Sequence, residues 1–191
     1  MASLCGLPME KFRLLYGRQR LELDRGTLSA EHYWGRILQE AGVASSPELI
    51  QRIEREDALG WMRVNQRVVD WSGELRSAGY RTAILSNMPT DKLSFMRGSA
   101  TMDWIGEFET AIFSCDVGLV KPEPAIYRLC LEKLKAAPGE CVFLDDYPVN
   151  VEGARAAGIN ALLFRSATEA AAELRDRWRL PVQCLVDGVH A

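Results

Sequence analysis

Two pairs of polar residues and one lysine in this sequence have side chains suited to bind phosphate and a divalent cation. Ser86 and Asn87 supply a hydroxyl and an amide, which can donate hydrogen bonds to phosphoryl oxygens. Lys121 precedes Pro122, and Pro124 follows shortly, so the backbone around the lysine is restricted. A lysine held in this way before a helix is suited to bind an anion. These residues predict a phosphate site.

Asp145 and Asp146 form the second pair, and Asn150 follows about one helical turn later. Two adjacent carboxylates suit Mg²⁺, which prefers oxygen ligands and often takes one or two from the protein, with phosphate and water completing its shell. A single aspartate before a helix could instead be an N-cap. A cap does not need two acids, so the pair predicts a Mg²⁺ site.

Each of these groups follows a short apolar segment, which is typical of parallel strands in an α/β fold. The apolar segments are residues 82–85, 110–113, 141–144 and 161–164, and helical patterns at 124–134 and 150–157 separate the later ones. This alternation predicts a parallel sheet covered by helices on both faces. Ligands of such sheets bind beyond the carboxyl ends of the strands, where the polar residues stand.

The first part of the chain, residues 8–78, has apolar residues at helical spacing and predicts helices without strands. Ser29 opens one helix, which Gly42 ends, and Ser46 opens the next, with a proline at its first position. A further helix is expected over 64–78. The fold therefore begins with a helical part and continues as α/β.

Composition excludes several classes of protein. The 23 basic and 26 acidic residues give a net charge of −3, which indicates neither a nucleic-acid nor an anionic-membrane partner. No apolar stretch approaches the roughly 20 residues that span a bilayer, and the first residues lack a signal peptide's pattern, so we expect a cytoplasmic protein. Five cysteines without CxxC spacing and two histidines favour neither zinc nor disulfides.

Three segments together resemble the haloacid dehalogenase superfamily of Mg²⁺-dependent phosphohydrolases. They are residues 84–87, 118–127 and 142–158. The resemblance implies a Rossmann-like, three-layer core at 65–191 and a small helical cap at 1–64, which includes a remnant of the first core helix. Residues 26–34 are similar to a cap segment of the branch that includes sugar-phosphate phosphatases and the amino-terminal phosphatase domain of soluble epoxide hydrolases.

The resemblance also implies a role for each polar residue. Ser86 would hydrogen-bond a phosphoryl oxygen, with Asn87 supporting it, and Lys121 would hold the nucleophile and the phosphate. Asp145 and Asp146 would serve the Mg²⁺ site, with Asn150 in support. Positioning and charge neutralisation of this kind are what phosphoryl transfer requires.

The sequence departs from the superfamily at the D-x-D motif, whose first aspartate forms an aspartyl-phosphate and whose second is the general acid/base. This motif ends the family's first strand, which is central in the sheet, between the strands carrying Ser86 and Asp145. Residues 22–27 superficially resemble the motif, but we interpret them as a loop of the cap. Residues 182–189 are strand-like and end in Asp-Gly-Val, although Leu185 stands at the nucleophile's place.

Removing a central strand leaves backbone groups unpaired, so something must fill its position. The carboxyl-terminal segment, a partner chain or an upstream sequence could do so. Residues 1–7 read as the interior of a helix, which favours a start codon misplaced downstream of the strand. Pairing with a second copy through the open sheet edge is an alternative that the sequence leaves open.

Two functions follow from these observations. The first is a Mg²⁺-dependent phosphatase of a small phosphorylated metabolite, whose nucleophile-bearing strand is absent from this chain. The second is a catalytically inactive module that binds a phosphate or a partner without turnover.

Overall fold

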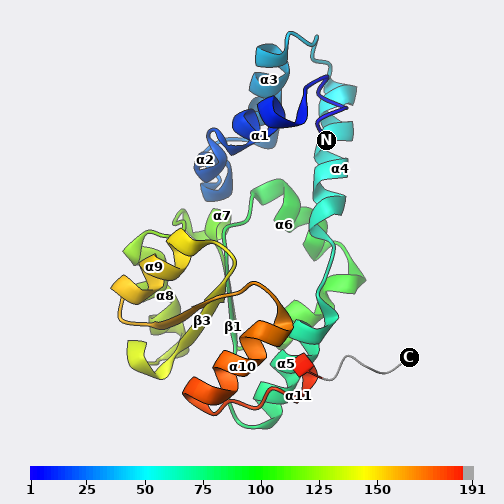
Figure 1. The fold of residues 1–191 in the computed structure, drawn as a ribbon. Helices are drawn as coiled ribbons and strands as arrows, with labels where there is room; N and C mark the ends of the chain where they lie inside the picture. Colours follow the sequence, from blue (N-terminus) through cyan, green and yellow to red (C-terminus); the bar gives the residue numbers. More distant parts are fainter. Residues whose placement is uncertain (187–191) are drawn as a thin grey trace, which may run out of the picture. The chain divides into compact units, whose positions relative to one another are not determined.

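The computed structural model describes residues 1–186, and helices occupy most of the first 77, as the apolar spacing predicts (Figure 1). Their bounds are α1 Met9–Gly17, α2 Arg20–Arg25, α3 Ala30–Ala41, α4 Pro47–Trp61 and α5 Gln66–Ser77. The hydroxyl of Ser29 accepts a hydrogen bond from the third N–H beyond it, and Ser46 does the same for α4. Gly42 ends α3 in the left-handed conformation, so the predicted caps are confirmed.

Two expectations for the amino-terminal region are wrong. Residues 2–6 form turns rather than the interior of a helix, and the first helix begins only at Met9. Gly6 has φ 62° and Pro8 is extended at ψ 146°, so a continuous helix cannot pass through them. The segment 22–27, expected to be a loop, is helical up to Arg25, where α2 ends.

The strand-like segment at 182–189, which we do not expect to replace the first strand, is not a strand as far as the structure describes it. Residues Gln183–Val186 form the short helix α11, and 187–189 lie outside the described residues. The carboxylate of Glu74 accepts hydrogen bonds from the N–H groups of Gln183 and Cys184, each at 2.9 Å, which satisfies donors at a helix start. Leu185 is fully buried, which fixes the helix against its neighbours.

The second part of the chain alternates strands and helices, and this confirms the predicted α/β class. The strands are β1 Ala83–Ser86, β2 Thr110–Phe113, β3 Val142–Asp145 and β4 Asn160–Leu163, each within one residue of its predicted place. The helices are α6 Thr90–Arg97, α7 Ser114–Val117, α8 Pro124–Leu134, α9 Pro148–Ala156 and α10 Ala167–Trp178, with 3₁₀ segments at Ala100–Glu107 and Pro138–Glu140.

The chain forms two compact units, each assembled from separate stretches of sequence. The first unit consists of residues 1–63, 86–103 and 113–120, and the second of residues 64–85, 104–112 and the chain from 121 onward. The boundary between a cap at 1–64 and a core at 65–191 stays a prediction.

The first unit is built around the aromatic side chains of α1 and α3. Trp34 and Tyr33 are fully buried, and their rings meet edge to face with centroids 5.1 Å apart. α2 packs on α7, where Gly26 allows a close approach: a Cβ at this position would lie 3.3 Å from Cys115. Gly26 also has φ 81°, which a larger residue adopts only with strain.

A buried ion pair joins α4 to α6 within the first unit. The ammonium of Lys92, which is 0% exposed, lies 2.5 Å from a carboxylate oxygen of Asp57, which is also buried. The other carboxylate oxygen of Asp57 accepts a hydrogen bond from the hydroxyl of Tyr16 at 3.2 Å. Because both charges are removed from water, each depends on the other for compensation.

The second unit has three layers. Figure 1 shows α8 and α9 on one side of the strands and α5, α10 and α11 on the other. Side chains alternate accordingly along β3: Val142 and Leu144 pack toward the α5 side, whereas the Phe143 ring meets Tyr127 of α8 with centroids 5.8 Å apart. Apolar residues on both faces of a strand are what a doubly covered sheet requires.

The strands of the second unit form two separate pairs within residues 1–186. β1 pairs with β2, and β3 pairs with β4 in parallel, with Val142 opposite Asn160 and Asp145 opposite Leu163. No strand of the described chain lies between β1 and β3. The sheet is therefore divided where the sequence analysis expects a missing central strand.

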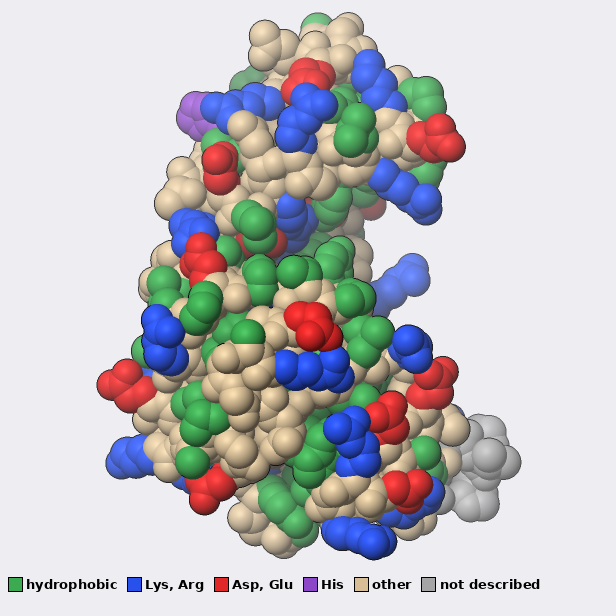
Figure 2. Space-filling view, turned by 60° about the vertical axis from the view of Figure 1, so that its left-hand side comes forward, with side chains coloured by type: hydrophobic (Ala, Val, Ile, Leu, Met, Phe, Trp, Pro, Cys, Tyr) green, Lys and Arg blue, Asp and Glu red, His purple; other side chains and the backbone are tan. Residues whose placement is uncertain are grey.

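The surface carries charges of both signs. Figure 2 shows basic and acidic side chains interspersed on the face it displays, without an extended patch of either sign. Among the described residues, every helix is too short or too polar to cross a bilayer.

We expect Lys92→Met to lower the free energy of unfolding by about 3 kcal/mol, because the carboxylate of Asp57 then stays buried without its counter-charge. Urea denaturation measures the change. Arg18→Ala is the control: it removes an ion pair to Glu40 in which both side chains are about half exposed, and should cost less than about 1 kcal/mol. Equal changes in the free energy of unfolding for the two substitutions would show that the buried ion pair stabilises the fold no more than an exposed one.

Candidate functional site

The buried ammonium of Lys121 connects the carboxyl ends of β1 and β3. Its Nζ donates a hydrogen bond to the carbonyl oxygen of Leu85 at 2.7 Å and another to the Oδ2 of Asp145 at 2.6 Å. The lysine is 7% exposed, and its Nζ lies 5.4 Å from the centroid of the Phe143 ring. The predicted lysine is thus held at the strand ends rather than solvated.

Asp145 uses both of its carboxylate oxygens. While Oδ2 pairs with Lys121, Oδ1 accepts a hydrogen bond from the backbone N–H of Tyr147 at 2.8 Å and from the side-chain amide of Asn150 at 2.9 Å. The bond to the residue two positions later is the local turn that aspartate favours after a strand. Four groups therefore form one buried polar cluster in the second unit.

The first two turns of α9 position Asn150. The helix begins with Pro148, a residue favoured at the first helical position, and Asn150 is buried on its inner face. The hydroxyl of Tyr127 donates a hydrogen bond to the carbonyl oxygen of Asn150 at 2.7 Å. Burial raises the pKa of Tyr127, and the negative charge of Asp145 raises it further, so this hydroxyl stays protonated and able to donate.

Gly153 allows α9 to approach the loop that carries Lys121. A Cβ at this position would lie 2.8 Å from the Cβ of Pro122 and 3.0 Å from its carbonyl oxygen. The same atom would meet the hydroxyl of Tyr127 at 3.0 Å. These distances are shorter than van der Waals contact, so only glycine permits the observed packing of helix against loop.

Asp146 differs from its neighbour because it is exposed and makes no hydrogen bond or ion pair within the described chain. The two adjacent acids thus have different environments: Asp145 is saturated with donors, and Asp146 has both oxygens available. Among residues 1–186, no group of three or more acidic, histidine or cysteine side chains is placed to hold a metal ion.

The structure brings together three of the six predicted site residues, Lys121, Asp145 and Asn150, with Asp146 adjacent in the chain. Ser86 is the last residue of β1, and it directly follows Leu85, whose carbonyl binds Lys121. Ser86 and Asn87 belong to the first unit and are partly buried. The hydroxyl of Ser86 makes no hydrogen bond within the described residues. Their contact with a phosphate stays a prediction.

Sequence reasoning missed the roles of Tyr127 and Gly153. A signal for Gly153 exists: glycine within a helical pattern has a cost of about 1 kcal/mol and so indicates close packing. Tyr127 lies on the buried face of α8 together with Ile126 and Cys130. From sequence, an aromatic residue at such a position is interpreted as part of the hydrophobic core. Its hydrogen bond to α9 depends on tertiary structure.

The chain belongs to the haloacid dehalogenase-like hydrolases, whose sequence pattern matches residues 7–158. It is similar to bifunctional epoxide hydrolase 2 of Rattus norvegicus, with 34% identity over 120 residues, or 61% of this chain. That segment is only 22% of the relative's length. It is also similar to phosphatase MT3486 of Mycobacterium tuberculosis, with 27% identity over 178 residues, which cover 84% of this chain and 75% of the relative.

A solved structure confirms the fold. The HAD family enzyme bt-2542 of Bacteroides thetaiotaomicron, in complex with magnesium and inorganic phosphate, aligns with a TM-score of 0.60. The alignment has 22% sequence identity and covers 82% of this chain and 78% of that one. The predicted α/β fold and family are therefore confirmed.

We expect Lys121→Met to lower the free energy of unfolding by about 3 kcal/mol, because it leaves the buried carboxylate of Asp145 without its counter-charge. Asp146→Asn should change it by less than about 0.5 kcal/mol, since this side chain is exposed and makes no hydrogen bond or ion pair within residues 1–186. Urea denaturation of both variants tests whether only Asp145 contributes to stability. A similar decrease of the free energy of unfolding in both variants would show that Asp146 also stabilises the fold.

Gly153→Ala should destabilise the protein by about 1–3 kcal/mol, because the added methyl group overpacks against Pro122 and Tyr127. The matched control is Gly73→Ala in α5, where the nearest atom to a Cβ lies at 3.7 Å. This change should stabilise by up to about 1 kcal/mol through helix propensity. Thermal unfolding measures both, and stabilisation by both would contradict the close approach.

Proposed function

We propose that this chain forms the greater part of a Mg²⁺-dependent phosphatase for a small phosphorylated metabolite, acting through an aspartyl-phosphate. The observation that carries the proposal is a buried ammonium, Lys121, and an uncommitted carboxylate, Asp146, at the carboxyl ends of two strands. A cation and a free anionic oxygen ligand are what the phosphate group and Mg²⁺ each require. The nucleophilic aspartate belongs to a strand outside the 191 residues.

The residues of the site divide the work. Lys121 neutralises charge on the phosphoryl oxygens. Asp145 is a positioning residue: it holds the ammonium of Lys121 in place and is itself fixed by Asn150. Because these groups are buried and mutually bonded, the positive charge is oriented before a substrate binds.

Asp145 and Asp146 are not equally available as ligands for Mg²⁺. Both oxygens of Asp145 already accept hydrogen bonds, so a metal would have to displace a donor, whereas Asp146 can ligate at once. We assign Asp146 as the direct ligand and Asp145 as a supporting residue, with phosphate oxygens and water completing the shell. When bound, the ion supplies neutralisation of charge on the phosphoryl group.

The relatives include phosphatases as well as (S)-2-haloacid dehalogenases, and the phosphatases among them support the proposal. Phosphatase MT3486 matches over most of this chain, and the Bacteroides thetaiotaomicron enzyme was solved with magnesium and inorganic phosphate. A Mg²⁺ site has no role in a metal-free dehalogenase. An exposed carboxylate next to a buried lysine suits phosphate chemistry instead.

The test uses a chain extended upstream, in frame, by an apolar strand that ends in Asp-x-Asp. We expect hydrolysis of p-nitrophenyl phosphate that EDTA abolishes, and a loss of about 100-fold in kcat/KM for Asp146→Asn, as expected for removal of one stabilising ligand. Asp176→Asn, the same change at an exposed site on α10, is the control and should retain full activity.

Activity that is independent of Mg²⁺, or unaffected by Asp146→Asn, would overturn the assigned metal ligand. Turnover of a 2-haloacid in place of the phosphate ester would overturn the phosphatase. A folded but inactive extended chain would favour the non-catalytic binding module.

A further inference from the structure

The loop between β3 and α9 is a short exposed arch that is held at both of its ends. Asp145 and Asn150 are buried, and a hydrogen bond of 2.9 Å joins their side chains. The four residues between them, 146–149, are all exposed. We call residues 146–149 the β3–α9 arch.

Hydrogen bonds and a proline fix the backbone of the β3–α9 arch. The N–H of Tyr147 donates to the carboxylate of Asp145 at 2.8 Å, and the carbonyl oxygen of Tyr147 accepts from the N–H of Asn150 at 3.0 Å. Pro148 follows, and its ring restricts φ. Because the backbone is already ordered, a ligand that contacts this arch loses little free energy to ordering it.

Three apolar side chains of the β3–α9 arch face solvent. Tyr147 is 63% exposed and Val149 is 55% exposed, on either side of the exposed Pro148. Within residues 1–186, the ring of Tyr147 contacts no other ring or cation, and its hydroxyl makes no hydrogen bond. A single exposed apolar residue is ordinary, but three in succession on a fixed loop form a surface suited to binding.

This apolar surface adjoins the proposed site. Asp146, the proposed Mg²⁺ ligand, belongs to the same arch and directly precedes Tyr147. At the base of the arch, Asp145 binds the ammonium of Lys121 at 2.6 Å. A phosphate held by Lys121 and by a metal on Asp146 would therefore lie next to the apolar side chains of the arch.

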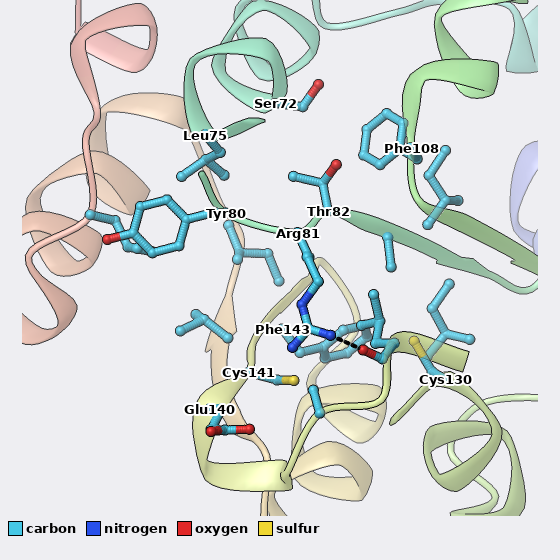
Figure 3. Close-up of a pocket in the computed structure, with 18 of the residues that line it drawn as sticks. Ser72, Leu75, Tyr80, Arg81, Thr82, Phe108, Cys130, Glu140, Cys141 and Phe143 are labelled. Carbon is cyan, nitrogen blue, oxygen red and sulfur yellow. Dashed lines mark hydrogen bonds between the residues drawn. The ribbon is translucent and has the colours of Figure 1, made fainter. Parts of the chain in front are cut away.

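The other side of the ammonium is covered by protein. The ring centroid of Phe143 lies 5.4 Å from the Nζ of Lys121, and Figure 3 shows this ring inside the second unit, near Cys130 and Cys141. Phe143 precedes Asp145 on β3, so its ring covers Nζ from the side of the strand's amino end. The arch lies beyond the carboxyl end, where ligands of such sheets bind.

We propose that Tyr147 holds the leaving group of the phosphate ester and makes the enzyme prefer an aryl ester to the ester of a polyol. Its exposed ring offers an apolar face to a flat leaving group, and Pro148 and Val149 extend this face. A polyol would lose water there without gaining hydrogen bonds from the apolar side chains. The inference rests on the proposed function, which assigns Lys121 to the phosphate and Asp146 to Mg²⁺.

The test compares two substrates of the chain extended upstream by a strand that ends in Asp-x-Asp. They are p-nitrophenyl phosphate and glycerol 3-phosphate. We expect Tyr147→Ala to raise KM for the aryl ester about 10-fold and to change kcat by less than about 2-fold, because the contact is equal in the ground and transition states. KM for glycerol 3-phosphate and the inhibition constant of inorganic phosphate, which has no leaving group, should change by less than about 2-fold.

Two further variants separate this contact from a structural effect. Tyr147→Phe keeps the aromatic ring and should retain the original KM for both esters. Tyr80→Ala is the matched control, because Tyr80 is 44% exposed and lies just before the amino end of β1, away from the strand ends that carry the site (Figure 3). It should leave the ratio of the two KM values unchanged.

The inference is overturned if Tyr147→Ala changes KM for the two esters by the same factor, or changes neither. A lower KM for glycerol 3-phosphate than for the aryl ester in the unsubstituted chain would also overturn it. In these cases the enzyme still hydrolyses phosphate esters, so the proposed function stands. An extended chain that hydrolyses neither ester contradicts the proposed function, and this inference with it.

Discussion

One ammonium group connects two strands that no ladder joins within residues 1–186. Lys121 bonds the end of β1 through a carbonyl and the end of β3 through a carboxylate, and both bonds are shielded from water. Asp145 can hold this charge only because the N–H of Tyr147 and the amide of Asn150 fix its other oxygen. The packing of α9, which depends on a glycine facing the lysine's loop, completes the arrangement.

The bond to Lys121 explains why Asp145 and Asp146, although adjacent, lie in different environments. A carboxylate that already accepts three hydrogen bonds is structural, and its cost of burial is offset by the charge beside it. Its neighbour one position later is exposed and makes no hydrogen bond or ion pair within residues 1–186, which is why we propose it as the Mg²⁺ ligand. The site thus combines a preorganised positive charge with one available ligand, as phosphoryl transfer requires.

The sequence predicts this much because each element has a local signal. The apolar segments gave all four strands within one residue, and the serine caps gave the starts of α3 and α4. The helix at 183–186 could not be predicted, because a carboxylate from α5, more than a hundred residues earlier, caps it. The ion pair of Lys92 and Asp57 left a weak signal, since Asp57 continues the buried spacing of Ile50 and Ile53.

The most direct measurement is to read the in-frame sequence upstream of the Met1 codon together with the 5′ end of the transcript. We predict an apolar strand that finishes in Asp-x-Asp within the transcribed frame. A transcript that begins close to Met1, with no such strand encoded, would contradict the account of this chain as the greater part of a phosphatase.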